Sequence, residues 1–184
     1  VAAGEALLRS GACVDDDIYV SGCLGDAAGG LKVVVENLED TAARYATLRS
    51  RYQSPLARIS LGQSLQGLAS ACIDVSDGLT SEVLHLSKQS EVGITIYEDK
   101  LPIDHTTMNL AKEMKLNPIF CALNGGEDYE LLFTISQEHY EKIKKDIDFT
   151  VIGHVTDKSE GNNFVTKDNT SHPITAQGWD PIKK

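Results

Sequence analysis

The stretch that most constrains the fold of this chain runs from Ile73 to Leu79, where a short apolar strand gives way to a helix. Ile73 and Val75 are apolar and strand-forming, and polar residues follow where the strand ends. From Leu79 onward, apolar residues recur with helical spacing. Such a junction presents unpaired N–H groups and the positive end of a helix dipole, which are features that bind phosphate oxygens.

Two carboxylates, Asp74 and Asp77, stand three residues apart at this junction, with Ser76 between them. Carboxylate oxygens suit Mg²⁺, so the pair is typical of a cation that bridges protein and phosphate. A plainer interpretation is that Asp77 caps the helix and Asp74 is a solvated strand end, because such caps are common. The local pattern leaves both interpretations open.

Length and composition favour one globular domain, because the 184 residues are 41% hydrophobic and 24% charged. A formal net charge of −10 argues against direct binding to nucleic acid or to an anionic membrane. We find no signal peptide and no long apolar run, so we expect no membrane association. The four cysteines form no CxxC pair, which argues against zinc and, as free thiols, indicates the cytoplasm.

The order of predicted helices and strands indicates an α+β sandwich with a mixed sheet, since it gives no repeated βαβ pattern. The predicted strands cover 18–20, 92–97, 129–135 and 150–155, with a hairpin or loose strands in 161–179. The predicted helices cover 27–38, 41–52, 59–71, 106–115, 118–123 and 137–147, besides the one that begins at residue 78.

A second unusual segment runs from Gly125 to Leu131, with two glycines followed by three acids. Glycines allow a close backbone approach or a positive φ. Strand alternation would send Glu127 to one face and Asp128 and Glu130 to the other. The segment is compatible with ligand or metal contacts, and equally with a hairpin turn whose acidic edge prevents aggregation.

Taken together, residues 73–79 and 125–133 resemble the thiamine-monophosphate kinase family. Further blocks occur in the order expected for that family, at residues 9–12, 17–22 and 24–28, at Pro55 and Arg58, and at Gly178-Trp179-Asp180. The resemblance covers nearly the whole chain. It implies the layered α+β sandwich of the carboxy-terminal domain in the aminoimidazole-ribonucleotide synthetase superfamily.

The resemblance also implies a domain organisation. Residues 1–184 would form a single carboxy-terminal domain, in which residues 1–12 connect to an amino-terminal ATP- and Mg²⁺-binding domain outside this sequence. The full-length protein would be a homodimer through that amino-terminal domain. We therefore expect no kinase activity from this chain alone.

The activity implied is ATP-dependent phosphorylation of thiamine monophosphate to thiamine diphosphate, the final step of thiamine diphosphate biosynthesis. By resemblance, Asp74 and Asp77 are Mg²⁺ ligands, and Ser76 and Arg9 contact ATP. The alternative for Arg9 is an ordinary surface cation.

Two residues match positions that contact the thiamine moiety in the family. Glu127 would accept a hydrogen bond from the aminopyrimidine or face the thiazolium. Trp179 would form an aromatic wall suited to a cationic ring, although a lone tryptophan near a chain end is more often a core residue. Two other functions stay open, namely an ATP-dependent synthetase of the same superfamily with another acceptor, and a non-catalytic module that binds thiamine phosphates.

Overall fold

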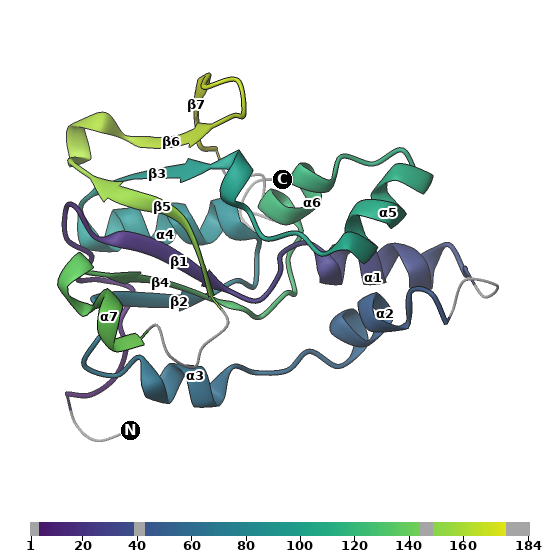
Figure 1. Cartoon of the computed structure of the whole chain (residues 1–184), viewed down its shortest axis with the longest axis horizontal. Helices are drawn as coiled ribbons and strands as arrows, with labels where there is room; N and C mark the ends of the chain where they lie inside the picture. The colour runs from purple at the N-terminus through teal and green to yellow at the C-terminus, as the bar shows by residue number, and fades with distance from the viewer. Residues whose placement is uncertain (1–3, 39–42, 144–148, 176–184) are drawn as a thin grey trace, which may run out of the picture.

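A computed structural model describes residues 4–38, 43–143 and 149–175. Its centre is a seven-stranded mixed sheet with the strand order β2-β4-β1-β5-β3-β6-β7 (Figure 1). Neighbouring strands are antiparallel except for the parallel pair β3 and β6. The strands are β1 Asp17–Ser21, β2 Ala71–Asp74, β3 Gly93–Tyr97, β4 Leu131–Ile135, β5 Phe149–Thr156, β6 Asn162–Val165 and β7 Ser171–Pro173. The predicted α+β class with a mixed sheet is confirmed.

Helices lie against the sheet and beyond one of its ends (Figure 1). They are α1 Asp26–Val35, α2 Ala46–Gln53, α3 Ile59–Ser64, α4 Leu79–Ser90, α5 His105–Glu113, α6 Pro118–Asn124 and α7 Tyr140–Ile143. Short 3₁₀ turns are η2 Glu98–Lys100, η3 Gln137–His139 and η4 Lys158–Glu160. Helices α1, α2, α5 and α6 gather at one end of the sheet, whereas α4 runs along one sheet face. Within the described ranges, no helix has both the length and the apolar character needed to cross a membrane.

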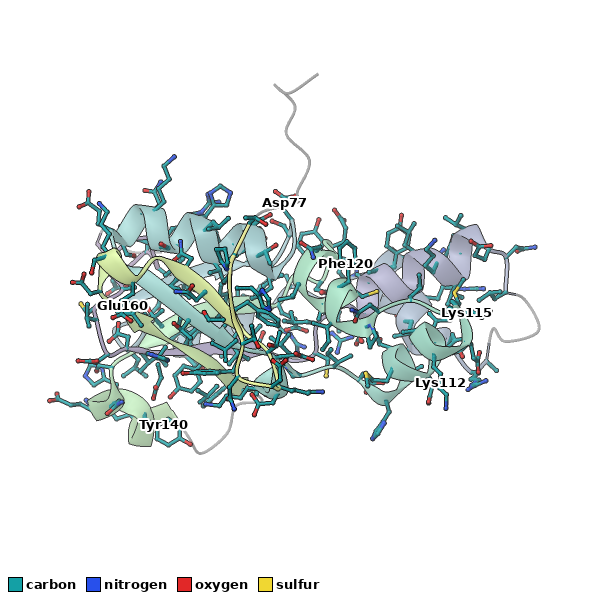
Figure 2. The ribbon with its side chains drawn as sticks, turned by 90° about the horizontal axis from the view of Figure 1, so that it is seen from above. Asp77, Lys112, Lys115, Phe120, Tyr140 and Glu160 are labelled. Carbon is teal, nitrogen blue, oxygen red and sulfur yellow. The ribbon has the colours of Figure 1, made fainter. Side chains whose placement is uncertain are left out.

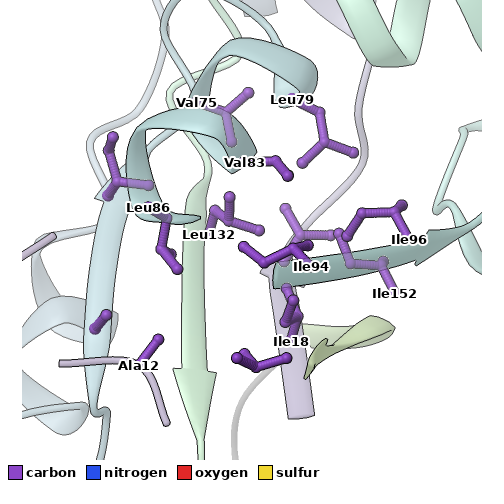
Figure 3. Packing of buried hydrophobic residues seen from close by; sticks show 14 of the residues in the cluster. Ala12, Ile18, Val75, Leu79, Val83, Leu86, Ile94, Ile96, Leu132 and Ile152 are labelled. Atoms are coloured by element: carbon purple, nitrogen blue, oxygen red, sulfur yellow. The ribbon is translucent and has the colours of Figure 1, made fainter. Parts of the chain in front are cut away.

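The main core fills the space between α4 and one face of the sheet (Figure 3). Alternation along β1 explains why both sheet faces are covered, because Ile18 and Val20 point into this core and Tyr19 points to the opposite face. The Tyr19 ring stacks on Phe133 with 5.5 Å between centroids. Side chains from α3 and α7 pack on this second face, so β2 and β4 are buried on both sides.

Several predicted element boundaries differ from the structure. The helix expected over 59–71 ends at Ser64, because the chain turns at Gly67 (φ 73°) and enters β2 at Ala71. The amide of Ser70 already donates to Thr134 of β4 at 2.9 Å, so sheet pairing replaces the last helical turns. Part of the expected helix over 41–52 and part of that over 137–147 lie outside the described residues.

Candidate active site

The strand-to-helix junction forms as expected, with β2 ending at Asp74 and α4 beginning at Leu79. The N-cap residue is Gly78, and among the described residues no side chain caps this helix, so the interpretation of Asp77 as its cap is wrong. The buried carboxylate of Glu82 instead accepts hydrogen bonds from the Asp77 amide (3.1 Å) and the Ser76 hydroxyl (3.4 Å). The Asp77 carboxylate is exposed. It lies at the amino-terminal end of α4, which points toward the end of the sheet where α1, α2, α5 and α6 gather (Figure 2).

The second motif lies directly against this junction. The Glu127 amide donates to the Ser76 carbonyl and the Tyr129 amide to the Val75 carbonyl, both at 2.9 Å. The Val75 amide donates in return to the Glu130 carbonyl at 2.7 Å. A side chain at Gly126 would place its Cβ 2.4 Å from the Ser76 carbonyl oxygen, so only glycine allows this approach. Two segments that are some fifty residues apart in sequence thus form one continuous surface.

Glu127 and Tyr129 hold an unusual backbone conformation at this contact, with φ angles of 69° and 51°. Residues other than glycine rarely adopt positive φ, and such strain concentrates at functional sites. The structure therefore differs from the predicted strand over 129–135, which begins only at Leu131. The predicted alternation still holds in burial, because Asp128 and Glu130 are buried while Glu127 is exposed.

Tyr129 contacts one of the predicted site carboxylates and lies within electrostatic range of two others. Its hydroxyl donates to Glu127 Oε2 at 3.1 Å. The pKa of Tyr129 is raised, first by this hydrogen bond and the charge of Glu127, and further by the charges of Asp74 and Asp77. The hydrogen bonds between residues 75–76 and 127–130 therefore join the segment that carries Asp74 and Asp77 to the segment that carries Glu127, which the family resemblance predicted as metal-binding and substrate-binding residues.

Arg9 approaches the same region from the edge of the sheet. It shares an open groove of about 440 Å³ with Asp74, Arg58 and the buried thiol of Cys72. The chain before it follows β2, since the Cys72 amide donates to the Leu8 carbonyl at 2.7 Å. Burial raises the pKa of Cys72 to about 12, which disfavours the reactive thiolate form.

The described residues contain no cluster of three or more His, Cys, Asp or Glu side chains that could hold a metal ion. Asp74 and Asp77 can supply two carboxylates. Mg²⁺ is commonly bound through one or two carboxylates, with the other positions taken by water and substrate phosphates. The residues present therefore fit a Mg²⁺ ion that arrives with a phosphate ligand, and do not form a complete protein cage.

Two buried acids of the second motif were not predicted as site residues, and both have defined partners. Asp128 accepts hydrogen bonds from the Gly25 amide (2.8 Å) and the Ala27 amide (2.9 Å), so it joins the motif to the start of α1. Burial raises its pKa to about 7, although these two hydrogen bonds act in the opposite direction. The predicted alternation placed both acids on the face opposite Glu127, and the structure shows that this face is buried.

Glu130 is the other buried acid, with 1% of its side chain exposed. It accepts hydrogen bonds from Arg58, Arg51 and the Ser21 hydroxyl. Neither arginine was predicted as a site residue, although Arg58 was noted within the family pattern. Trp179, the predicted aromatic wall, lies outside the described residues.

Comparison with known proteins defines the class of this fold and site. Residues 14–165 match the family model of the AIR synthase related protein, C-terminal domain, and the chain belongs to that family. Within this class, it resembles thiamine-monophosphate kinases, as the motifs predicted. It is 39% identical over 188 residues to the Salmonella typhimurium thiamine-monophosphate kinase, which covers 98% of this chain and 56% of the relative. The Aquifex aeolicus thiamine-monophosphate kinase is 38% identical over 171 residues, covering 93% of this chain and 53% of the relative.

Solved structures agree with this placement. The structure described as AaThiL complexed with AMPPCP and TMP superposes with a TM-score of 0.83 at 34% identity, over 96% of this chain and 54% of that one. The Stenotrophomonas maltophilia thiamine-monophosphate kinase gives a TM-score of 0.79 at 36% identity, over 91% and 54%. The hydrogenase maturation protein HypE of E. coli, at 18% identity, shares the fold. The chain spans about half the length of the curated relatives it matches.

Proposed function

We propose that this chain is part of a kinase that transfers the γ-phosphoryl group of ATP to thiamine monophosphate and forms thiamine diphosphate, the final step of thiamine diphosphate biosynthesis. The observation that carries the proposal is the hydrogen-bonded contact between residues 75–76 and 127–130, which joins the segment of Asp74 and Asp77 to that of Glu127. The names of the relatives and the complex of one of them with AMPPCP and TMP support it.

The chemistry of the acceptor explains why this site needs to neutralise phosphate charge more than it needs a general base. Thiamine monophosphate carries a phosphate that is largely ionised at neutral pH, so the attacking oxygen has little need to be deprotonated. The main difficulty is to bring two polyanions together and align them. Mg²⁺, when bound, would neutralise phosphate charge. Asp74 and Asp77 would hold it, and the acidic character of the chain suits this role.

The remaining predicted residues divide between the two substrates in this proposal. Arg9 in the groove and Ser76 at the junction would contact ATP phosphates, the first through its charge and the second through its hydroxyl or backbone. Glu127 would accept from the aminopyrimidine or face the thiazolium, and Trp179 would wall the pocket. The exposed Glu127 carboxylate beside Tyr129 supports a role at the surface of the site.

The domain organisation and location complete the proposal. Residues 1–184 form the carboxy-terminal domain, residues 1–12 connect it to an amino-terminal half with further ATP- and Mg²⁺-binding residues, and that half forms a homodimer. The length of the relatives supports a second half. The chain alone would then be inactive. The free thiols of Cys13, Cys72 and Cys121 support a cytoplasmic location, because reduced thiols persist there.

A coupled assay of ADP formation in the intact protein tests this function. ATP, Mg²⁺ and thiamine monophosphate should support turnover, whereas thiamine as the control acceptor should not, because it lacks the attacking phosphate. Turnover with thiamine, or none with either acceptor, would contradict the proposal. Turnover only with a different acceptor would instead support an ATP-dependent synthetase of the same superfamily.

A further inference from the structure

We propose that Arg58 binds a phosphate group in the groove that it shares with Arg9 and Asp74, and that buried Glu130 positions it. This inference rests on the proposed function, because phosphoryl transfer brings the phosphates of a nucleotide and of an acceptor to this groove. Both sources present the same ligand chemistry. Arg58 would thus be a further binding residue of the site, and Glu130 a positioning residue.

The contact between Arg58 and Glu130 fixes the guanidinium in one plane. Arg58 Nε donates to Glu130 Oε2 at 2.6 Å and Nη2 donates to Oε1 at 2.5 Å. The Ser21 hydroxyl also donates to Oε2, at 2.5 Å. A bidentate arginine–carboxylate pair adds geometric specificity as well as energy. The carboxylate is buried, so its orientation, and with it that of Arg58, is set by the fold.

The backbone at Gly22 leaves room for the pair of Arg58 and Glu130. A Cβ at Gly22 would lie 2.4 Å from Glu130 Oε1 and 2.7 Å from Arg58 Nη2. Gly22 also has a φ of 56°. The turn that ends β1 is therefore shaped around this ion pair.

Arg58 differs from Arg51, although both contact Glu130. Arg58 has 29% of its side chain exposed and lines the groove. Arg51 contacts Glu130 Oε1 at 3.2 Å and interacts electrostatically with Asp26 and Asp104, and it lies outside the set of described residues that line the groove. Of the two arginines that contact Glu130, Arg58 is therefore the one that lines the groove.

The charges in the groove suit a phosphate bound to a metal. Two guanidiniums, from Arg9 and Arg58, line the same groove as the Asp74 carboxylate. If Asp74 held Mg²⁺ and the ion supplied charge neutralisation, Arg9 and Arg58 would be left to bind phosphate oxygens.

Substitutions in the intact protein test the inference by comparing ligands with and without phosphates. Arg58→Ala should weaken the affinity for AMPPCP, or raise the KM for thiamine monophosphate, by about 10- to 100-fold, the usual range for a hydrogen bond to a charged group. The affinity for adenosine should stay within about twofold. A change in AMPPCP binding assigns the nucleotide phosphates, and a change in the KM for thiamine monophosphate assigns the acceptor phosphate.

Arg51→Ala is the matched control, because it removes the other guanidinium from Glu130. It should change both quantities by less than about twofold. A folded Arg58→Ala protein with unchanged AMPPCP affinity and unchanged KM would overturn the inference. An equal loss in Arg51→Ala would overturn it as well, since the effect would then come from leaving Glu130 with fewer partners.

The positioning role of Glu130 has its own readout. Glu130→Gln keeps the size of the side chain but removes its charge, and it should raise the same KM or dissociation constant with kcat less affected. If Glu130→Gln does not fold, Arg58→Lys keeps the charge without the bidentate geometry and should recover only part of the affinity. Full recovery by lysine would contradict the need for positioning.

These results separate the inference from the proposed function. A wild-type protein without thiamine-monophosphate-dependent turnover, but with AMPPCP binding that depends on Arg58, would refute the function and support the phosphate site. Normal turnover with no effect of Arg58→Ala would refute the phosphate site alone. Absence of both turnover and AMPPCP binding would refute both.

Discussion

The backbone amide of Glu127 donates a hydrogen bond to the carbonyl of Ser76 at 2.9 Å. This bond joins the segment proposed to contact thiamine to the segment proposed to hold the metal and ATP. Any change that separates the two segments should therefore disturb both substrates at once. A change to one side chain that leaves the bond intact should affect only one of them.

Asp74→Ala in the intact protein should lower kcat by about 100-fold or more, because it removes one of the two carboxylates proposed to hold Mg²⁺. The melting temperature should change little, since Asp74 is only half-buried at the end of β2. Glu160→Ala is the control, because Glu160 is an exposed acid far from the site (Figure 2). If the folded Asp74→Ala protein had the kcat of the wild type, Asp74 would not be a residue of the site.

Glu127→Gln should raise the KM for thiamine monophosphate by about tenfold while the KM for ATP stays nearly constant, because a neutral amide interacts less with a cationic ring. The same change should lower the pKa of Tyr129, since the charge and hydrogen bond of Glu127 raise it. NMR of the tyrosine ring carbons measures this pKa. An unchanged pKa would show that the hydroxyl has another partner.

Gly126→Ala should lower the free energy of unfolding by about 1–3 kcal/mol, because its Cβ would lie 2.4 Å from the Ser76 carbonyl oxygen. Gly62→Ala is the matched control, since its Cβ would meet the Leu131 side chain at an ordinary 3.9 Å. Urea denaturation measures both. Equal free energies of unfolding in the two variants would mean that the contact between Gly126 and Ser76 can widen at no cost.

Asp128 should make the protein less stable as the pH rises from about 4 to about 7. Burial raises the pKa of this carboxyl from 3.8 to about 7 in the folded state. Between these values the folded state binds more protons than the unfolded state, so the free energy of unfolding falls with increasing pH. Asp128→Asn should remove this contribution, on the order of 3 kcal/mol across the window.

The measurement is the free energy of unfolding of both proteins at several pH values. The difference between them isolates Asp128 from the other titrating groups. A difference that stays constant from pH 4 to pH 7 would contradict the raised pKa.

Trp179→Ala should raise the KM for thiamine monophosphate with little effect on the KM for ATP, because an aromatic wall interacts with the cationic ring and not with the nucleotide. Steady-state kinetics of the intact protein measures both constants. An altered KM for ATP with an unchanged KM for thiamine monophosphate would assign Trp179 to the nucleotide instead of the thiamine ring.

Local patterns of apolar residues were enough to predict β1 and α4, which both contribute side chains to the core. Apolar residues around Tyr19 predicted β1, and helical spacing after Gly78 predicted α4, because periodicity in sequence directly reflects burial on one face. The pattern over 59–71 was misleading. Leu61, Leu65 and Leu68 pack in one core cluster as the stripe of a single helix would, but the helix ends at Ser64 and the chain after it turns toward β2.

The candidate site was only partly predictable. Asp74, Asp77 and Glu127 carried chemical signals of their own, and the family pattern gave each a role. Glu130 was predicted only to share a face with Asp128, opposite Glu127. Its contact with Arg58, which is 72 residues away in the chain, has no local signature.

The sequence alone thus determined the class of fold and pointed to the two segments proposed to form the site, because both are visible in short-range patterns. Only the tertiary structure decided that these segments hydrogen-bond to one another, that Asp128 holds the start of α1, and that Arg58 is oriented by a buried carboxylate. The physical reason is that burial and close approach are properties of the packed chain. They decide which polar groups must pair with one another and which remain available to a ligand.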